Sequence, residues 1–157
     1  MTGTFTLRSG ATSTTYFDKY LFEGDPEILR DVARQMVSLV PEGTEVLAGL
    51  ELGGVPVATA LSLAAGLPAA FVRKEAKPYG TAKLAEGAEV AGKRVLVVED
   101  VITTGGQVAL STSDLRERGA VVDDVLCVID RSDGDHARLD AVSLRVRSLF
   151  TLDDLGR

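Results

Sequence analysis

The stretch Arg94-Val95-Leu96-Val97-Val98 constrains the fold more than any other part of the sequence. Such an unbroken aliphatic run, rich in β-branched residues, is typical of a strand that is buried on both faces of a parallel sheet. It is followed by Glu99 and Asp100, by a loop of hydroxyl and glycine residues, and by a helical pattern from about Gln107 to Arg118. This order of strand, polar loop and helix predicts an α/β domain whose ligands bind at the carboxyl ends of the strands.

The rest of the chain continues the alternation of helices and strands. One helix is expected over Asp25 to Val40, with Asp25 as its cap, and another over Val55 to Ala65, with Gly66 at its end. Arg73 to Gly92 shows no period and reads as loop. We therefore expect a single domain, residues 1–157, with a mostly parallel central sheet flanked by helices. Four further strands are predicted: Val46 to Leu50, Ala69 to Val72, Val121 to Asp130 and, at the sheet edge, Leu144 to Phe150.

Length and charge limit the classes of function. A chain of 157 residues has the size of one domain, and its net charge of -6 opposes binding to nucleic acid or to an anionic membrane. It contains no apolar run near the roughly 18 residues of a membrane span, and Met1 to Gly10 lack the pattern of a signal peptide. The sequence therefore predicts a cytoplasmic protein in which any anionic ligand is held by a local cluster of residues.

Two residue types often used in catalysis are scarce. Cys127 stands in the apolar run Val125 to Ile129, which favours a small buried side chain over a nucleophile. His136, the one histidine in the sequence, stands in a polar stretch and is expected to be exposed. A metal site built from several histidines is excluded by this count.

The loop Thr103-Thr104-Gly105-Gly106 has the composition of a phosphate site. Its glycines let backbone amides approach an anion, its hydroxyls add donors, and the following helix contributes a partial positive charge. It is neither a Walker loop nor a dinucleotide fingerprint. Glu99 and Asp100 would repel a phosphate unless they face ribose hydroxyls or a magnesium ion, so a sugar phosphate with a metal fits the whole motif. The alternative is that the two acids only end a strand and cap a turn.

Two other segments are candidates for anion binding. Arg73 to Lys83 holds four basic residues and one acidic residue, and such a loop can supply cations to a leaving group as negative charge develops. Gly49 to Pro56 follows a strand and opens a helix, so that its amides can hold another anion. A solvated charged loop and a tight glycine-containing connection are the respective alternatives.

Three segments carry a family resemblance. Val97 to Gly106 resembles the phosphoribosyl-diphosphate (PRPP) loop of type I phosphoribosyltransferases. Residues 73–87 look like the mobile catalytic loop of the orotate phosphoribosyltransferases, and Phe5 to Gly10 with Tyr16-Phe17 is similar to their amino-terminal orotate segment. The resemblance runs from about Phe5 to Arg131.

The resemblance implies the type I phosphoribosyltransferase fold, with a reduced amino-terminal hood because the segment at Phe5 stands so near the start. It implies transfer of ribose 5-phosphate from PRPP to orotate with Mg²⁺, which gives orotidine 5'-monophosphate and diphosphate, a step of pyrimidine biosynthesis. A homodimer that shares the loop 73–87 across its interface is also implied. The alternatives are a phosphoribosyltransferase for another base and a PRPP-binding paralogue without catalysis.

The resemblance also assigns roles to residues. Lys77, Asp100 and Glu99 are the expected catalytic residues, and no direct protein ligand of the metal is assigned. Leu52 stands where the family usually has a lysine, so part of the diphosphate binding falls to amides. The residues expected to bind PRPP are Gly53, Gly54, Arg73, Lys74, Lys77, Val101, Ile102, Thr103, Thr104, Gly105, Gly106 and Gln107. Those expected to bind orotate are Arg8, Tyr16, Phe17, Thr103 and Arg131.

Overall fold

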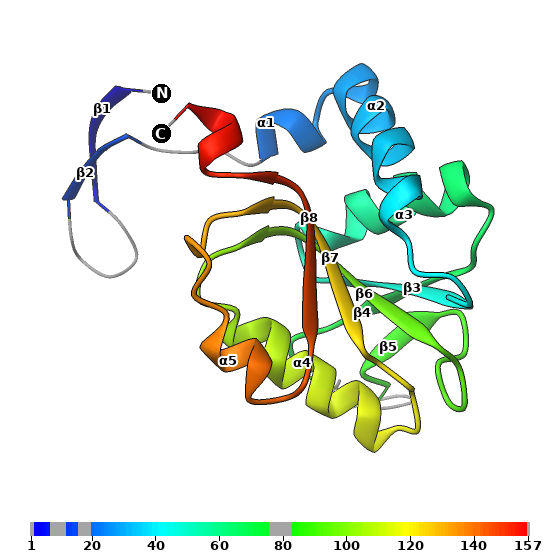
Figure 1. Ribbon diagram of the computed structural model, residues 1–157. Coiled ribbons are helices and arrows are strands. Elements are labelled where there is room, and N and C mark those ends of the chain that lie inside the picture. The colour runs from blue at the N-terminus through cyan, green and yellow to red at the C-terminus, as the bar shows by residue number, and fades with distance from the viewer. Residues whose placement is uncertain (1, 7–11, 16–19, 76–82, 157) are drawn as a thin grey trace.

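The computed structural model describes residues 2–6, 12–15, 20–75 and 83–156, and a central sheet organises them (Figure 1). Its strands are β3 (Val46–Leu50), β4 (Ala69–Val72), β5 (Ala85–Gly87), β6 (Val95–Ile102), β7 (Asp124–Asp130) and β8 (Arg145–Thr151). They follow the order β5-β4-β3-β6-β7-β8, and every neighbouring pair is parallel except β4 with β5. A separate antiparallel hairpin pairs β1 (Thr2–Thr6) with β2 (Thr12–Thr15). The mostly parallel sheet confirms the predicted α/β class.

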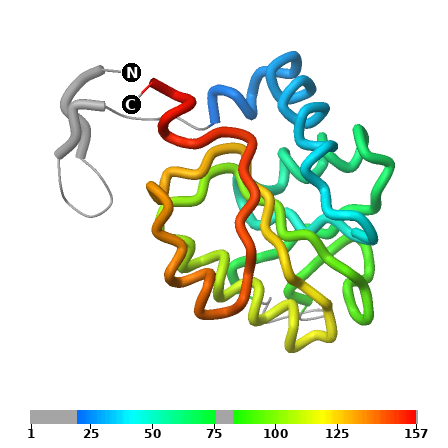
Figure 2. The backbone as a smooth tube through the Cα atoms, viewed as in Figure 1, coloured from blue at the N-terminus to red at the C-terminus, as the bar shows by residue number. Residues whose placement is uncertain are grey.

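Helices cover both faces of the sheet, as the ribbon and the tube show (Figures 1 and 2). On one face lie α2 and α3, and on the other lie α4 and α5. None of the helices in the described part of the chain is long and apolar enough to cross a membrane. The helical segments are α1 (Tyr20–Glu23), α2 (Pro26–Met36), α3 (Gly54–Ala65), α4 (Gly106–Glu117) and α5 (Ala137–Asp140), with 3-10 turns η1 (Val37–Leu39) and η2 (Asp153–Leu155).

The strand β3 shows why the sheet needs both helical layers. Its five residues are all buried. Val46, Ala48 and Leu50 belong to the core cluster that includes α4, whereas Leu47 belongs to the cluster that includes α2 and α3. Successive residues of a strand point to opposite faces, so an unbroken apolar strand is stable only where both faces are covered.

Several predicted helix boundaries are confirmed by the caps. The Asp25 carboxylate accepts hydrogen bonds from the N–H groups of Glu27 (2.9 Å) and Ile28 (3.1 Å), which satisfies donors that the first turn leaves free. Gly66 ends α3 in the left-handed conformation, with φ of 69°. The prediction that the first helix reaches Val40 was wrong, because the chain tightens into η1 after Met36.

Three strand predictions also need correction. β6 continues to Ile102, which pairs with Asp130, because β7 offers a parallel partner to the acidic residues that were expected to end the strand. β7 begins at Asp124, with only an isolated bridge at Val121 before it, and β8 begins at Arg145. The short β5 lies in the segment predicted to be loop, where three residues add to the edge of the sheet through backbone bonds to β4.

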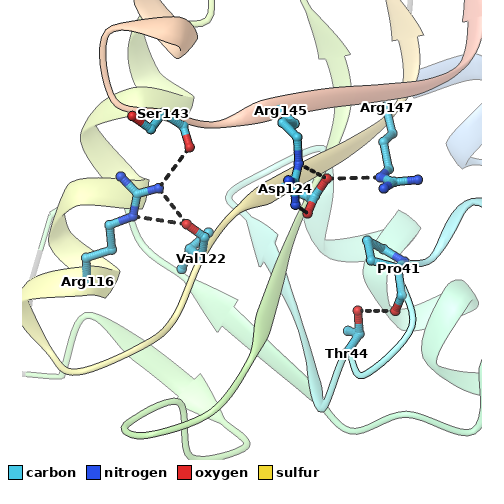
Figure 3. Close-up of polar contacts among 8 residues, drawn as sticks. All are labelled: Pro41, Thr44, Arg116, Val122, Asp124, Ser143, Arg145 and Arg147. Atoms are coloured by element: carbon cyan, nitrogen blue, oxygen red, sulfur yellow. Dashed lines mark hydrogen bonds and ion pairs between the residues drawn. The ribbon is translucent and has the colours of Figure 1, made fainter.

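At the amino ends of the strands, polar side chains fasten β8 to β7 (Figure 3). Asp124 is 5% exposed and accepts hydrogen bonds from Arg145 (2.8 and 3.1 Å) and Arg147 (3.0 Å). The bond from Arg145 holds the pKa of Asp124 below its usual value although burial opposes this, and Arg147 adds to the effect. Arg116 of α4 donates to the carbonyls of Val122 and Val142. These contacts therefore stabilise the amino-terminal edge of the sheet.

Candidate active site

The candidate active site lies at the opposite edge, where the parallel strands end. Leu50 of β3 pairs with Val72 of β4, β3 pairs in parallel with β6, and Ile102 of β6 pairs with Asp130 of β7. Since parallel strands finish at one edge, the loops that follow these four strands meet there. The last residues of β6 carry the acidic pair, and the loops carry the start of the basic segment, the glycines of the two candidate anion sites and Arg131. The topology thus brings together segments that are far apart in the sequence.

The acidic pair is held by its own strand. Asp100 is 1% exposed, and Glu99 is half-buried. The Oε1 atom of Glu99 accepts a hydrogen bond from the N–H of Asp100 (3.0 Å), and Oδ1 of Asp100 accepts one from the N–H of Val101 (2.6 Å). Both bonds are made within the strand, so each carboxylate is held close to the backbone of β6.

The turn after β6 presents backbone donors. Thr103 and Thr104 are exposed, and Gly105 adopts the left-handed conformation (φ 69°) that glycine reaches without steric cost. Among the described residues, no side chain caps the start of α4, so its first N–H groups are available to an anion. Of the other residues expected to bind PRPP here, Val101 and Ile102 end β6, and Gly106 and Gln107 begin α4.

The short helix α5 covers this turn and adds a cation that the sequence pattern did not reveal. A Cβ placed on Gly105 would lie 2.8 Å from Cγ of the buried Leu139, and one on Gly106 would lie 2.8 Å from Nη1 of Arg138. Arg138 is exposed, and its guanidinium stands beside Gly106, the first residue of α4. A helix of one turn has too little periodicity to be detected, which explains why this neighbour was missed.

The loop after β3 lies directly against the acidic pair. A Cβ on Gly53 would lie 1.8 Å from Oδ2 of Asp100, and one on Gly54 would lie 2.4 Å from the carbonyl oxygen of Val98. Both positions therefore need glycine, as expected for a loop that approaches another strand closely. The Glu51–Leu52 peptide bond is cis, and the side chain of Leu52 is 66% exposed.

The start of the basic segment joins this loop. The N–H of Arg73 donates to the carbonyl of Leu84 (2.9 Å), and the N–H of Lys74 donates to Oε1 of Glu51 (2.5 Å). The Nε atom of Arg73 is buried and has no hydrogen-bond partner among the described residues. A buried donor of this kind is costly unless a ligand or water satisfies it, which favours an anion nearby.

Arg131 follows β7 in a turn that is tightly held. Its N–H donates to the carbonyl of Ile102 (2.8 Å), and the preceding Asp130 is 8% exposed. Oδ1 of Asp130 accepts from the N–H of Ser132 (2.9 Å), and Oδ2 lies 2.7 Å from Nε2 of His136. Burial raises the pKa of Asp130, but the bonds from Ser132 and His136 outweigh it and keep the pKa below its ordinary value. The expectation that His136 is exposed was wrong: its side chain is 26% exposed, because it reaches this carboxylate.

The remaining candidates divide into two groups. Cys127 is fully buried in β7, and burial raises the pKa of its thiol, so the prediction of a structural cysteine is confirmed. Four predicted site residues lie outside the described part of the chain and remain predictions: Arg8, Tyr16, Phe17 and Lys77.

Comparison with known proteins identifies related sequences over almost the whole chain. The model of the phosphoribosyl transferase domain family matches residues 24–145. The orotate phosphoribosyltransferase of a Nocardioides species is 59% identical over 155 residues, which cover 99% of this chain and 87% of that protein. The orotate phosphoribosyltransferase of Methanocella arvoryzae is 44% identical over 153 residues, which cover 98% of this chain and 87% of that protein.

Comparison with solved structures finds the same kind of enzyme. The orotate phosphoribosyltransferase of Mycobacterium tuberculosis in complex with Fe(III) dicitrate has a TM-score of 0.88 and 38% identity, covering 99% of this chain and 91% of that one. The same enzyme in complex with PRPP has a TM-score of 0.83 and 36% identity, covering 98% and 90%. Sequence and structure together show that this chain belongs to the orotate phosphoribosyltransferases within the phosphoribosyl transferase domain family.

Proposed function

We propose that the chain transfers ribose 5-phosphate from PRPP to N1 of orotate. The observation that carries this proposal is the contact between Asp100 and Gly53, since it places a buried carboxylate between two loops suited to anions. PRPP is a sugar with a phosphate at one end and a diphosphate at the other. It therefore matches a site in which a carboxylate lies between two anion-binding loops. The names of the relatives and the PRPP complex of the Mycobacterium tuberculosis enzyme support the same substrate pair.

The reaction breaks the bond between C1 of the ribose and the diphosphate oxygen and forms a bond from C1 to N1 of orotate, whose proton is released. Positive charge develops on the ribose ring as the diphosphate leaves. Glu99 and Asp100 stabilise that positive charge, and Arg73, Lys74 and Lys77 stabilise the leaving group. The turn Thr103 to Gly106 holds the 5'-phosphate through its amides and hydroxyls, and Gly53 and Gly54 present amides to the diphosphate.

The site also fits a magnesium ion that arrives with the substrate. The part of the chain that the structure describes contains no cluster of three or more His, Cys, Asp or Glu side chains able to hold a metal. Mg²⁺ is commonly held by one or two carboxylates together with substrate oxygens, and Glu99 and Asp100 can supply the protein's share. When bound, the ion neutralises charge on the diphosphate.

For the base, we assign Arg131 to the orotate carboxylate. Its position at the carboxyl end of β7, beside the end of β6, supports this assignment. A planar guanidinium can bind two carboxylate oxygens at once. Thr103, the first residue after β6, is assigned to the same pocket. Arg8, Tyr16 and Phe17 are the other residues assigned to it.

A base screen tests the proposed function. With PRPP and Mg²⁺ present, the purified chain is expected to consume orotate, followed by the change in its ultraviolet absorbance, and to release diphosphate. Uracil, adenine and hypoxanthine serve as the competing bases. Turnover of one of these in preference to orotate would favour a phosphoribosyltransferase for another base, and PRPP binding without turnover of any base would favour a non-catalytic paralogue.

We further propose a homodimer that shares the loop 73–87 across its interface, so that part of this loop, with Lys77, acts in the site of the other subunit. The basic residues at the start of this segment and the resemblance of residues 73–87 support it. Mixing inactive Lys77→Ala with inactive Asp100→Asn is then expected to restore about a quarter of the activity, because random exchange makes half the dimers mixed and each has one intact site. The measurement is turnover after subunit exchange, shown separately by mixed labels. Exchange without any recovery of turnover would show that each site is built from one chain.

A further inference from the structure

Glu51 holds the exit of β4 on both sides of Arg73. Its N–H donates to the carbonyl of Val72 (2.9 Å), which continues the pairing of β3 with β4 by one residue. Its carboxylate Oε1 accepts from the N–H of Lys74 (2.5 Å). Arg73 itself is fixed by its bond to Leu84. The backbone from which the first two basic side chains project is therefore held at three consecutive residues.

Glu51 carries a negative charge close to a proposed anion site. The loop to which it belongs approaches Asp100 through Gly53 and is the proposed diphosphate loop. A carboxylate in such a loop repels a diphosphate, and this cost needs a compensating role. A charge-assisted hydrogen bond from a backbone N–H is among the stronger ones in proteins, and here it joins two loops that must bind the same leaving group.

We propose that Glu51 is a positioning residue that locks the diphosphate loop to the start of the basic segment. Through this bond, Arg73 and Lys74 begin from a fixed place beside Gly53 and Gly54 before the substrate binds. The cations and the amides then form one preorganised site for the diphosphate. This inference rests on the proposed function, because it concerns the leaving group of that reaction.

Three variants distinguish a positioning role of Glu51 from an effect of its charge. Glu51→Gln removes the charge but keeps an oxygen acceptor, Glu51→Asp keeps the charge but withdraws the acceptor by one methylene, and Glu51→Ala removes both. The matched control is Glu42→Ala, at an exposed glutamate near the opposite edge of the sheet. Calorimetry with diphosphate and Mg²⁺ measures the affinity directly, and amide hydrogen exchange at Lys74 measures the bond.

We expect Glu51→Ala and Glu51→Asp to weaken diphosphate binding about 10-fold to 100-fold and to speed exchange at Lys74, with Glu51→Gln and the control within about threefold of the original protein. The KM for PRPP should rise in step, while the affinity for ribose 5-phosphate, which lacks the diphosphate, stays unchanged. Equal effects of Gln, Asp and Ala, or tighter binding in Gln and Ala alike, would overturn the proposal. If the original protein fails to turn over orotate, the proposed function falls, yet the exchange and calorimetry of the variants still decide the role of Glu51.

Discussion

Asp100→Asn is expected to lower kcat by about 10²-fold to 10³-fold while the protein remains folded. The buried carboxylate lies against Gly53. In the proposed reaction it stands next to the phosphate site, where positive charge develops on the ribose. Asparagine has nearly the same shape and retains an Oδ1 acceptor for the N–H of Val101, so packing is preserved and the negative charge alone is lost. Steady-state turnover of orotate measures the effect, and thermal unfolding reports the fold.

Asp123→Asn is the matched control for this variant. Asp123 is exposed and lies near the amino end of β7, at the edge of the sheet opposite the site. Its amide variant is expected to keep the original turnover. If Asp100→Asn were as active as this control, the buried carboxylate would have no part in stabilising the transition state, and Glu99 alone would remain as the acid.

Arg131→Leu is expected to remove most of the preference for orotate over uracil. The two bases differ by one carboxylate, and a contact between a guanidinium and a carboxylate contributes about 2 to 3 kcal/mol, or roughly two orders of magnitude in specificity. Leucine keeps apolar bulk but cannot donate a hydrogen bond. The ratio of kcat/KM for orotate and uracil measures the change, and the affinity for PRPP should be unaltered.

The control here is Arg34→Leu, at an arginine of α2 whose side chain is 66% exposed. It loses the same charge on another part of the surface, so any general effect of net charge on substrate binding appears in both variants. An Arg131→Leu protein that still preferred orotate a hundredfold would place the carboxylate elsewhere, with Arg8 as the next candidate.

The fold followed from local signals wherever these were strong. The unbroken run from Val95 predicted a central strand, Asp25 predicted a helix start and Gly66 a helix end, and all three are present. The failures arose where a distant partner decides the structure. β6 continues through the acidic residues because β7 pairs with it, and β5 exists because the edge of β4 is free to accept it.

The same division applies to the candidate site. The turn from Thr103 to Gly106 is a contiguous motif, so the sequence shows its composition and its place between strand and helix. The contacts of Glu51 with Lys74, of His136 with Asp130 and of Arg138 with Gly106 join residues from different loops. Each of these side chains lies in an ordinary polar stretch, and nothing in its local sequence indicates its partner.

The strand order has a consequence for how activity is gained during folding. The loops of the site follow β3, β4, β6 and β7, whose parallel pairings join residues about 20 to 50 positions apart in the chain. Helices form within microseconds, whereas pairings over such separations are slow because the intervening chain must first be ordered. Recovery of turnover after dilution from denaturant should therefore lag behind the recovery of helical circular dichroism.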